Sequence, residues 1–279
     1  MKVSLPAWSD KFSAENLSLV SDGLPEGPIT REWAWGNTSG RGIRVGILDS
    51  GIDGHHPAVG KEISGWASFY LDRASGEVVR SMEVHDDSFG HGTACADVVR
   101  RLAPEADLVS IKVLGSNLRG RAVEFLAGLD WAIQEGLDVI NLSLGTTNSD
   151  YYAKFHRLTE EAYFRGICIV TAVNNMPIVS YPSMYSSAFS VACVPDREGY
   201  DPFEFYYSSS PPPEFGASGV GIDLAWAGGN TLSVTGNSFA APHIAGLLAR
   251  IRSKHRDLTP FQLKTVLRAT ALNTSGAEL

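Results

Sequence analysis

The chain has 279 residues, of which 44% are hydrophobic and 19% are charged, a balance typical of a globular protein rather than a disordered one. Its formal net charge of −8 argues against a nucleic-acid-binding protein, because such proteins present clusters of basic residues. No run of about 18 consecutive apolar residues occurs, so we expect no membrane-spanning helix and no membrane partner.

The N-terminus and the cysteines bear on the cellular compartment. Residues 1–6 lack the apolar core of a secretory signal. The cysteines, Cys95, Cys168 and Cys193, are odd in number and each lies in an apolar stretch, which favours buried free thiols in a reducing cytoplasm. Their spacing does not favour a metal site. We therefore predict a cytoplasmic protein that needs no metal and no cofactor.

The first candidate for chemistry is Asp49. Residues 1–30 are polar and contain three prolines, and we interpret them as an N-terminal surface arm with a short helix near residues 13–20. Residues 31–279 would form the main domain. Residues 42–48 are rich in β-branched side chains and predict a strand that ends at Asp49. Catalytic groups of open α/β sheets gather at such strand ends, although a turn aspartate is the alternative.

The second candidate is His91. Residues 60–82 indicate a hairpin with its turn at 72–76, and the helical spacing of residues 93–102 then places His91 at a helix start. Glycine on both sides of this histidine allows backbone or substrate to approach closely. The alternative is a surface or capping histidine.

Strands and helices alternate through the remaining chain. Further strands are expected at residues 108–113, 139–144, 167–173, 189–194 and 222–226, and further helices at residues 120–135, at 151–164 and from 259, where Thr259 and Gln262 form a capping box. Residues 201–219, with three successive prolines, are expected to form a long irregular surface stretch. This alternation predicts an α/β fold in one domain, with a mostly parallel central sheet and helices on both faces.

The third candidate is Ser238, in the segment Gly-Asn-Ser-Phe-Ala-Ala-Pro-His at residues 236–243. The apolar run after Ser238 predicts a helix that is buried on most sides. Ser238 would then lie at the helix N-terminus, where unpaired backbone N–H groups can receive an oxyanion. A plain N-cap serine is the alternative. Asp49, His91 and Ser238 are the residue types that nucleophilic catalysis needs, provided that the fold unites them.

Three segments resemble the signature segments of the subtilisin-like serine proteases: residues 49–52, 91–93 and 236–243, in the Asp, His, Ser order of that family. The likeness extends over about residues 42–267. It implies a single-domain subtilisin-like fold and a serine endopeptidase. By this resemblance Asp49 orients the base, His91 is the base and Ser238 is the nucleophile.

The resemblance also implies the oxyanion and substrate residues. Residues 170–175 match the family segment that ends in the oxyanion-hole asparagine, here Asn175, and a turn residue is the alternative. A peptide or protein substrate would bind as an added strand. The implied substrate-binding residues are Leu118, Arg119, Gly120, Ser143, Leu144, Gly145, Asn174 and Ser180. Because Asn174, Ser180 and Ser183 replace small family residues, we expect a narrowed, more polar specificity pocket.

Several features depart from the family. Asn237 replaces the usual threonine, and we expect its amide to donate to the oxyanion with lower activity. Asp86 and Asp87 could favour basic substrate side chains, or they form a solvated acidic loop. The strand before Asp49 begins about forty residues into the chain, which leaves no room for the prosegment of secreted members. We also expect no strong calcium site.

These departures predict an intracellular protease that processes a specific peptide or protein, with a possible delivery partner. The alternative is a catalytically silent subtilase-fold protein that only binds peptides, favoured by Asn237 and Asn174.

Overall fold

The centre of the molecule is a sheet of nine strands. The computed structural model describes residues 7, 9–13, 15, 23–60, 62–195 and 199–274. Within them the sheet strands are β1 (Arg44–Asp49), β2 (Gly65–Leu71), β3 (Val78–Ser81), β4 (Asp107–Lys112), β5 (Val139–Leu142), β6 (Cys168–Ala172), β7 (Phe189–Val194), β8 (Phe205–Tyr207) and β9 (Phe215–Ser218). Their order is β3-β2-β4-β1-β5-β6-β7-β9-β8. Only the edge pairs β2–β3 and β8–β9 are antiparallel.

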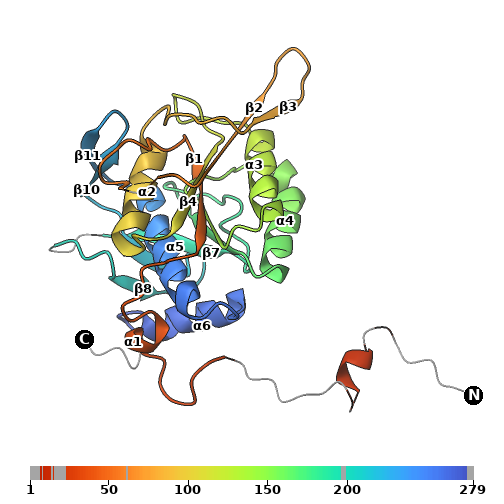
Figure 1. The fold of residues 1–279 in the computed structure, drawn as a ribbon. Helices are drawn as coiled ribbons and strands as arrows, with labels where there is room; N and C mark the ends of the chain where they lie inside the picture. The colour runs from red at the N-terminus through yellow and green to blue at the C-terminus, as the bar shows by residue number, and fades with distance from the viewer. Residues whose placement is uncertain are drawn as a thin grey trace, which may run out of the picture.

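Helices cover both faces of this sheet (Figure 1). They are α1 (Arg31–Ala34), α2 (His91–Leu102), α3 (Ala122–Gln134), α4 (Tyr152–Phe164), α5 (Asn237–Lys254) and α6 (Pro260–Thr270), with 3-10 turns at Ser9–Phe12 and Ser149–Tyr151. Helices α2 and α5 pack together against one face, and α3 and α4 pack against the other. The expected single-domain α/β fold, with a mostly parallel sheet, is confirmed.

The alternation of side chains along the strands creates two apolar cores. In β1, Val45 and Ile47 point into the core under α2 and α5, whereas Leu48 points into the core under α3 and α4. Parallel strands that are buried on both faces read as continuous apolar runs. For this reason β1 and the other central strands can be predicted from the sequence.

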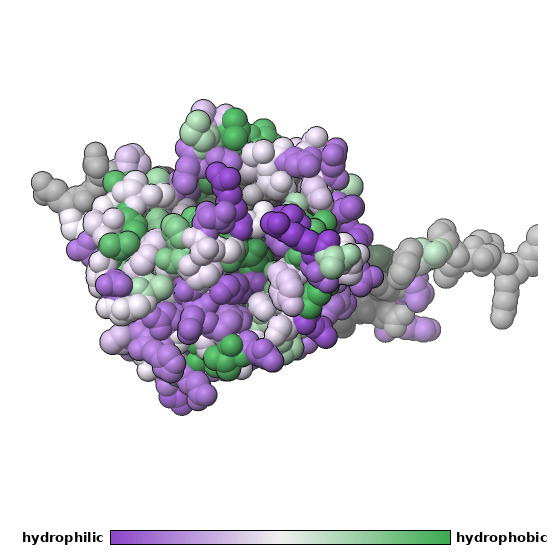
Figure 2. Space-filling model, turned by 90° about the horizontal axis from the view of Figure 1, so that it is seen from above, coloured by the Kyte–Doolittle hydropathy of each residue, from purple (hydrophilic) through white to green (hydrophobic). Residues whose placement is uncertain are grey.

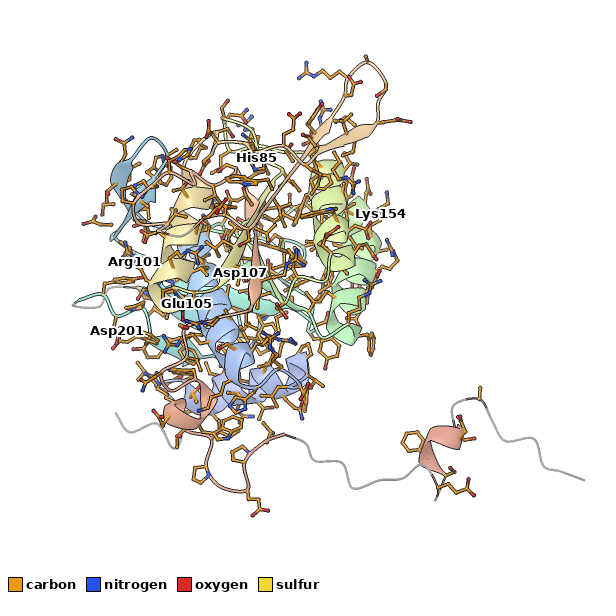
Figure 3. The ribbon with its side chains drawn as sticks, viewed as in Figure 1. His85, Arg101, Glu105, Asp107, Lys154 and Asp201 are labelled. Carbon is orange, nitrogen blue, oxygen red and sulfur yellow. The ribbon has the colours of Figure 1, made fainter. Side chains whose placement is uncertain are left out.

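Parallel pairing brings the ends of the central strands to one edge of the sheet. Asp49 at the end of β1 pairs with Lys112 at the end of β4, and Leu142 at the end of β5 pairs with Thr171 in β6. The residues that follow these strands therefore share one edge. In Figure 3, His85 lies toward this edge, while Glu105, just before β4, and Asp107, its first residue, lie lower on the molecule.

The expectation for residues 201–219 is wrong, because this stretch contains β8 and β9. Phe205 and Phe215 are buried, and β9 joins the sheet beside β7. The three prolines occupy the connection between these two strands. A second, two-stranded sheet of β10 (Ile222–Trp226) and β11 (Asn230–Val234) lies before α5, and β11 was not predicted.

Two further expectations concern the N-terminus and membranes. The helix expected near residues 13–20 falls mostly outside the described residues. Of the helices in the described part of the chain, none is both long and apolar enough to cross a bilayer.

The capping box predicted at Thr259 and Gln262 is confirmed at the start of α6.

Candidate active site

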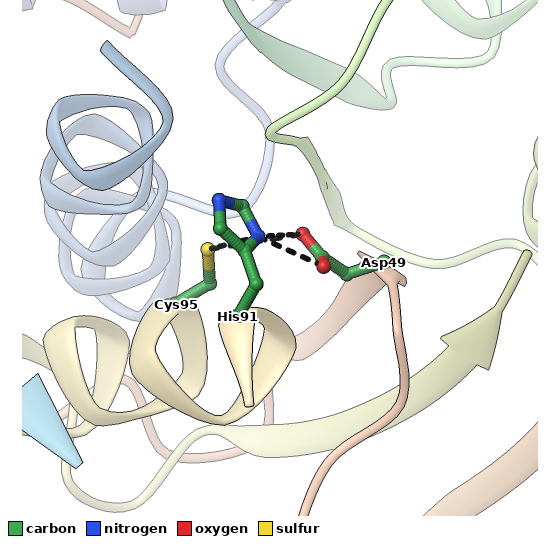
Figure 4. A group of neighbouring side chains, drawn as sticks. All are labelled: Asp49, His91 and Cys95. Atoms are coloured by element: carbon green, nitrogen blue, oxygen red, sulfur yellow. Dashed lines mark hydrogen bonds and ion pairs between the residues drawn. The ribbon is translucent and has the colours of Figure 1, made fainter. Parts of the chain in front are cut away.

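Asp49 and His91 form a buried, hydrogen-bonded pair (Figure 4). Asp49 ends β1 and is fully buried, and His91 opens α2 with 5% of its surface exposed. The Nδ1 atom of His91 lies 2.9 Å from each carboxylate oxygen of Asp49. Oxygen Oδ1 of Asp49 also accepts a hydrogen bond of 2.8 Å from the backbone N–H of Ser50. This arrangement keeps a proton on Nδ1, so Nε2 is the nitrogen that can accept another.

The charge of Asp49 changes the protonation of His91. Burial disfavours the charged imidazole, but the attraction of the Asp49 carboxylate and its hydrogen bond outweigh burial and hold the pKa of His91 well above its ordinary value. The pair therefore stabilises the imidazolium that forms when His91 takes up a proton.

Close backbone packing positions the start of α2. A Cβ atom on Gly92 would lie 2.0 Å from the carbonyl oxygen of Gly51, so only glycine permits this approach. The Asp87 carboxylate accepts hydrogen bonds from the backbone N–H groups of Gly90 and Thr93, at 2.8 Å each. Asp87 is thus committed to the helix start and buried. Asp86 is exposed, and the hypothesis that these two carboxylates favour basic substrate side chains stays a prediction.

Ser238 lies in the first turn of α5, beside this pair. Its backbone carbonyl accepts hydrogen bonds from Ser143 Oγ at 2.7 Å and from Cys95 Sγ at 3.6 Å. Cys95 Sγ in turn lies 3.9 Å from Asp49 Oδ2 and 4.0 Å from His91 Nδ1. The ring of the residue after Ser238, Phe239, packs on the His91 ring with centroids 5.0 Å apart. The fold therefore brings the three candidate residues to one place.

Asn175 borders the same space as the serine hydroxyl. A Cβ atom on Gly236 would lie 3.3 Å from Ser238 Oγ and 3.6 Å from Asn175 Nδ2. The backbone N–H of Asn237 donates to Asn175 Oδ1 at 2.9 Å. An amide N–H group beside the attacking hydroxyl is suited to receive an oxyanion.

The expectation that the Asn237 amide donates to the oxyanion is wrong. Its Nδ2 donates to the carbonyl oxygens of Val173 and Asn174, at 3.3 and 3.1 Å, and its Oδ1 accepts from the backbone N–H of Cys193 at 2.8 Å. No sequence pattern indicates these bonds, because their partners are backbone groups that lie more than forty residues away along the chain.

A cavity of about 420 Å³ opens beside His91. Both segments expected to bind substrate line it: Leu118, Arg119 and Gly120 from the stretch after β4, and Ser143, Leu144 and Gly145 from the stretch after β5. An extended peptide between such segments can pair with their backbone groups. Seen from above, the molecule intermingles apolar and polar residues rather than presenting one continuous apolar patch (Figure 2).

Asn174 and Ser180 are not among the residues that line this cavity. Ser180 is buried against Gly145, and its Oγ lies 3.1 Å from Ser183 Oγ. Asn174 Oδ1 accepts a hydrogen bond of 2.8 Å from the backbone N–H of Met176. Ser180 is thus held within the protein, whereas Asn174 is half-buried and bonds within its own turn.

Within the described residues, the group suited to a metal ion is Asp49, His91 and Cys95, whose ligand atoms lie within 4.8 Å of one another. One carboxylate, one imidazole and one thiol suit a thiophilic or borderline cation better than Ca²⁺. Burial raises the pKa of the Cys95 thiol, which disfavours the thiolate that a metal needs. A cation there would compete with Asp49 for His91 Nδ1.

Comparison with known proteins identifies the family. Residues 40–279 match the family model of the subtilases. The chain is 33% identical to subtilisin DY of Bacillus licheniformis, over 84% of this chain and 85% of that protein. It is 32% identical to a thermostable alkaline protease of Halalkalibacterium halodurans, over 83% of this chain but only 63% of that protein's length. A cold-adapted subtilisin-like serine proteinase shares the fold, with a TM-score of 0.65 and 24% identity over 84% of this chain and 83% of that one. The chain therefore belongs to the subtilase family of serine endopeptidases.

Proposed function

We propose that the chain hydrolyses peptide bonds through Asp49, His91 and Ser238. His91 Nε2 takes the proton of Ser238 Oγ, which attacks the substrate carbonyl carbon, while Asp49 stabilises the resulting imidazolium. The observation that carries this proposal is the buried, hydrogen-bonded Asp49–His91 pair beside the first turn of the Ser238 helix.

The rest of the cycle uses groups that border the same space. Asn175 Nδ2 and the backbone N–H of Ser238 stabilise the oxyanion of the tetrahedral intermediate. His91 then returns its proton to the leaving amine, and an acyl-enzyme forms on Ser238 Oγ. A water molecule, activated by the neutral His91, hydrolyses this ester and restores the serine.

The substrate chain before the cleaved bond lies in the cavity between Arg119 and Leu144, paired with the flanking backbone. The side chain next to the cleaved bond meets a narrow, polar pocket, because Ser180 is buried against Gly145 and Ser183 is buried with its Oγ 3.1 Å from Ser180 Oγ. We therefore expect small residues to be preferred at this position.

A fluorophosphonate probe and a peptide pool test this proposal. The wild-type protein should react with the probe at Ser238 and cleave peptides. Ser238→Ala should lose labelling and lower kcat by roughly 10⁶-fold, whereas Ser210→Ala, which changes an exposed serine away from the cavity, should behave as wild type. A wild-type protein that binds peptides but is neither labelled nor active would support the silent, peptide-binding alternative.

We further propose a role in the cytoplasm, where the enzyme processes a specific peptide or protein with the help of a delivery partner. The support is the cysteine content: all three cysteines are free, and Cys95 and Cys168 are buried, as is usual in a reducing compartment. Capture of substrates by Ser238→Ala from the cytoplasmic fraction should recover the same few proteins repeatedly. Recovery of the natural protein from culture medium alone would contradict this role.

A further inference from the structure

The side chain of Asn237 uses both donors and one of the two acceptor positions that a primary amide offers. It makes two donated bonds to the carbonyls of Val173 and Asn174, and it accepts one from the N–H of Cys193. Two of these partners directly precede Asn175, and the third belongs to β7. Asn237 therefore joins the ends of two neighbouring strands to the start of α5.

The backbone of Asn237 acts on Asn175 itself. Its N–H donates to Asn175 Oδ1 at 2.9 Å. An N–H group can bond only to an acceptor, so this contact selects the orientation in which Oδ1 faces Asn237 and Nδ2 faces the space above Gly236. Asn175 is exposed to solvent. Without this hydrogen bond, its side-chain amide would be free to rotate and exchange the positions of Oδ1 and Nδ2.

We propose that Asn237 is a positioning residue that orients Asn175 toward the oxyanion, an inference that rests on the proposed peptidase function. Its side chain fixes the backbone leading into Asn175, and its N–H fixes the Asn175 amide. A hydroxyl side chain has a single donor, so it cannot donate to Val173 and Asn174 at once. An aspartate has the same shape but would place carboxylate oxygen against both carbonyls.

The test compares Asn237→Asp with a matched control, Asn273→Asp. Asn273 also bonds a backbone N–H and a backbone carbonyl, those of Tyr207, but it follows α6 far along the chain from the site. Asn237→Asp should lower kcat about tenfold to a hundredfold with little change in KM, less than the roughly 10²–10³-fold loss that follows deletion of an oxyanion donor. Asn273→Asp should leave both constants unchanged.

A second readout separates positioning from a merely structural role. A peptide boronate forms a tetrahedral adduct with serine, whereas a product peptide does not. Asn237→Asp should weaken binding of the boronate by the same factor by which it lowers kcat, and it should leave the affinity for the product peptide unchanged. In an Asn175→Ala background, Asn237→Asp should have little further effect on kcat, because its target is gone.

The inference would be overturned if Asn237→Asp and Asn175→Ala affected kcat independently, or if Asn237→Asp changed only KM. If Asn237→Asp fails to fold by circular dichroism, Asn237→Ser provides the same comparison, since it retains one donor of the two. A wild-type protein that is inactive and unlabelled by the fluorophosphonate would overturn the proposed function instead. An active wild type in which Asn237 and Asn175 show no coupling would overturn only the role of Asn237.

Discussion

At the scale of single residues, the pH dependence of cleavage reports on the His91 imidazole. Only the neutral ring can take the Ser238 proton. Burial favours the neutral ring, but Asp49 outweighs it and holds the pKa of His91 well above 6.5. As the pH falls through this raised pKa, His91 becomes charged and kcat/KM drops. The acid limb of the wild-type profile should therefore lie above pH 6.5.

Asp49→Asn should move this acid limb to lower pH, because burial then acts on His91 without the opposing carboxylate. It should also lower kcat by about 10⁴-fold, since the ring is no longer held in the productive tautomer. Profiles of kcat/KM from pH 5 to 9 on one peptide measure both effects. An acid limb at the same pH in both proteins would exclude the proposed pairing as the source of the shift.

The same scale shows what a sequence can reveal. Asp49 ends an apolar strand, and His91 and Ser238 lie at the starts of apolar helices. Each therefore lies at the end of a strand or the start of a helix, where the site residues of open α/β sheets collect. Asn237 also stands at a helix start, but its bonds to Val173 and Cys193 depend on how β6 and β7 lie beside α5. Pairings of this kind follow from the tertiary fold, and no local pattern indicates them.

At the scale of elements, the site requires α2 to begin in contact with the end of β1. A methyl group on Gly92 would lie 2.0 Å from Gly51 O and 3.1 Å from Asp49 Cβ. Gly92→Ala should therefore push the first turn of α2 away from Asp49. We expect a loss of about 1–3 kcal/mol in the free energy of unfolding, and a fall of about 10²-fold in kcat through the misplaced His91.

Urea unfolding and steady-state kinetics measure these two effects. Gly27→Ala is the control, because no atom lies within 4 Å of the added Cβ and the residue has no positive φ. Wild-type kcat in Gly92→Ala would contradict the packing argument.

The elements themselves differ in how well they can be predicted. The central strands are buried on both faces and read as apolar runs, whereas β8 and β9 are three and four residues long and flank a proline-rich connection. Their stability comes from burial of Phe205 and Phe215, from the pairing of β9 with β7, and from the pairing of β8 with β9. These short strands form because β7 offers a sheet edge with which β9 can pair. The composition of residues 201–219 carries no information about that edge, so by itself it indicates a loop.

At the scale of the whole molecule, α5 runs through the core, and His243 ties it to a distant segment. His243 is fully buried. Its Nδ1 donates to the carbonyl of Phe239 and its Nε2 accepts from the Tyr200 hydroxyl, both at 2.9 Å. The ring must be neutral for this pattern. Burial lowers the pKa of His243 to about 4, and the positive charge of Arg101 acts in the same direction, while backbone hydrogen bonds oppose it.

This buried histidine predicts how global stability depends on pH. In the unfolded chain its pKa is about 6.5, so below that pH the unfolded state binds a proton that the folded state does not. The contribution is intact above pH 6.5 and is lost as the pH falls toward 4, by about 3 kcal/mol in full. His243→Gln lacks this titration, so its deficit in unfolding free energy relative to wild type should shrink between pH 7.5 and pH 4.5. Urea unfolding of both proteins across this range measures the difference, in which the titrations shared by both cancel. Parallel stability profiles would mean that His243 takes up its proton in the folded state, against the hydrogen-bond pattern with Phe239 and Tyr200.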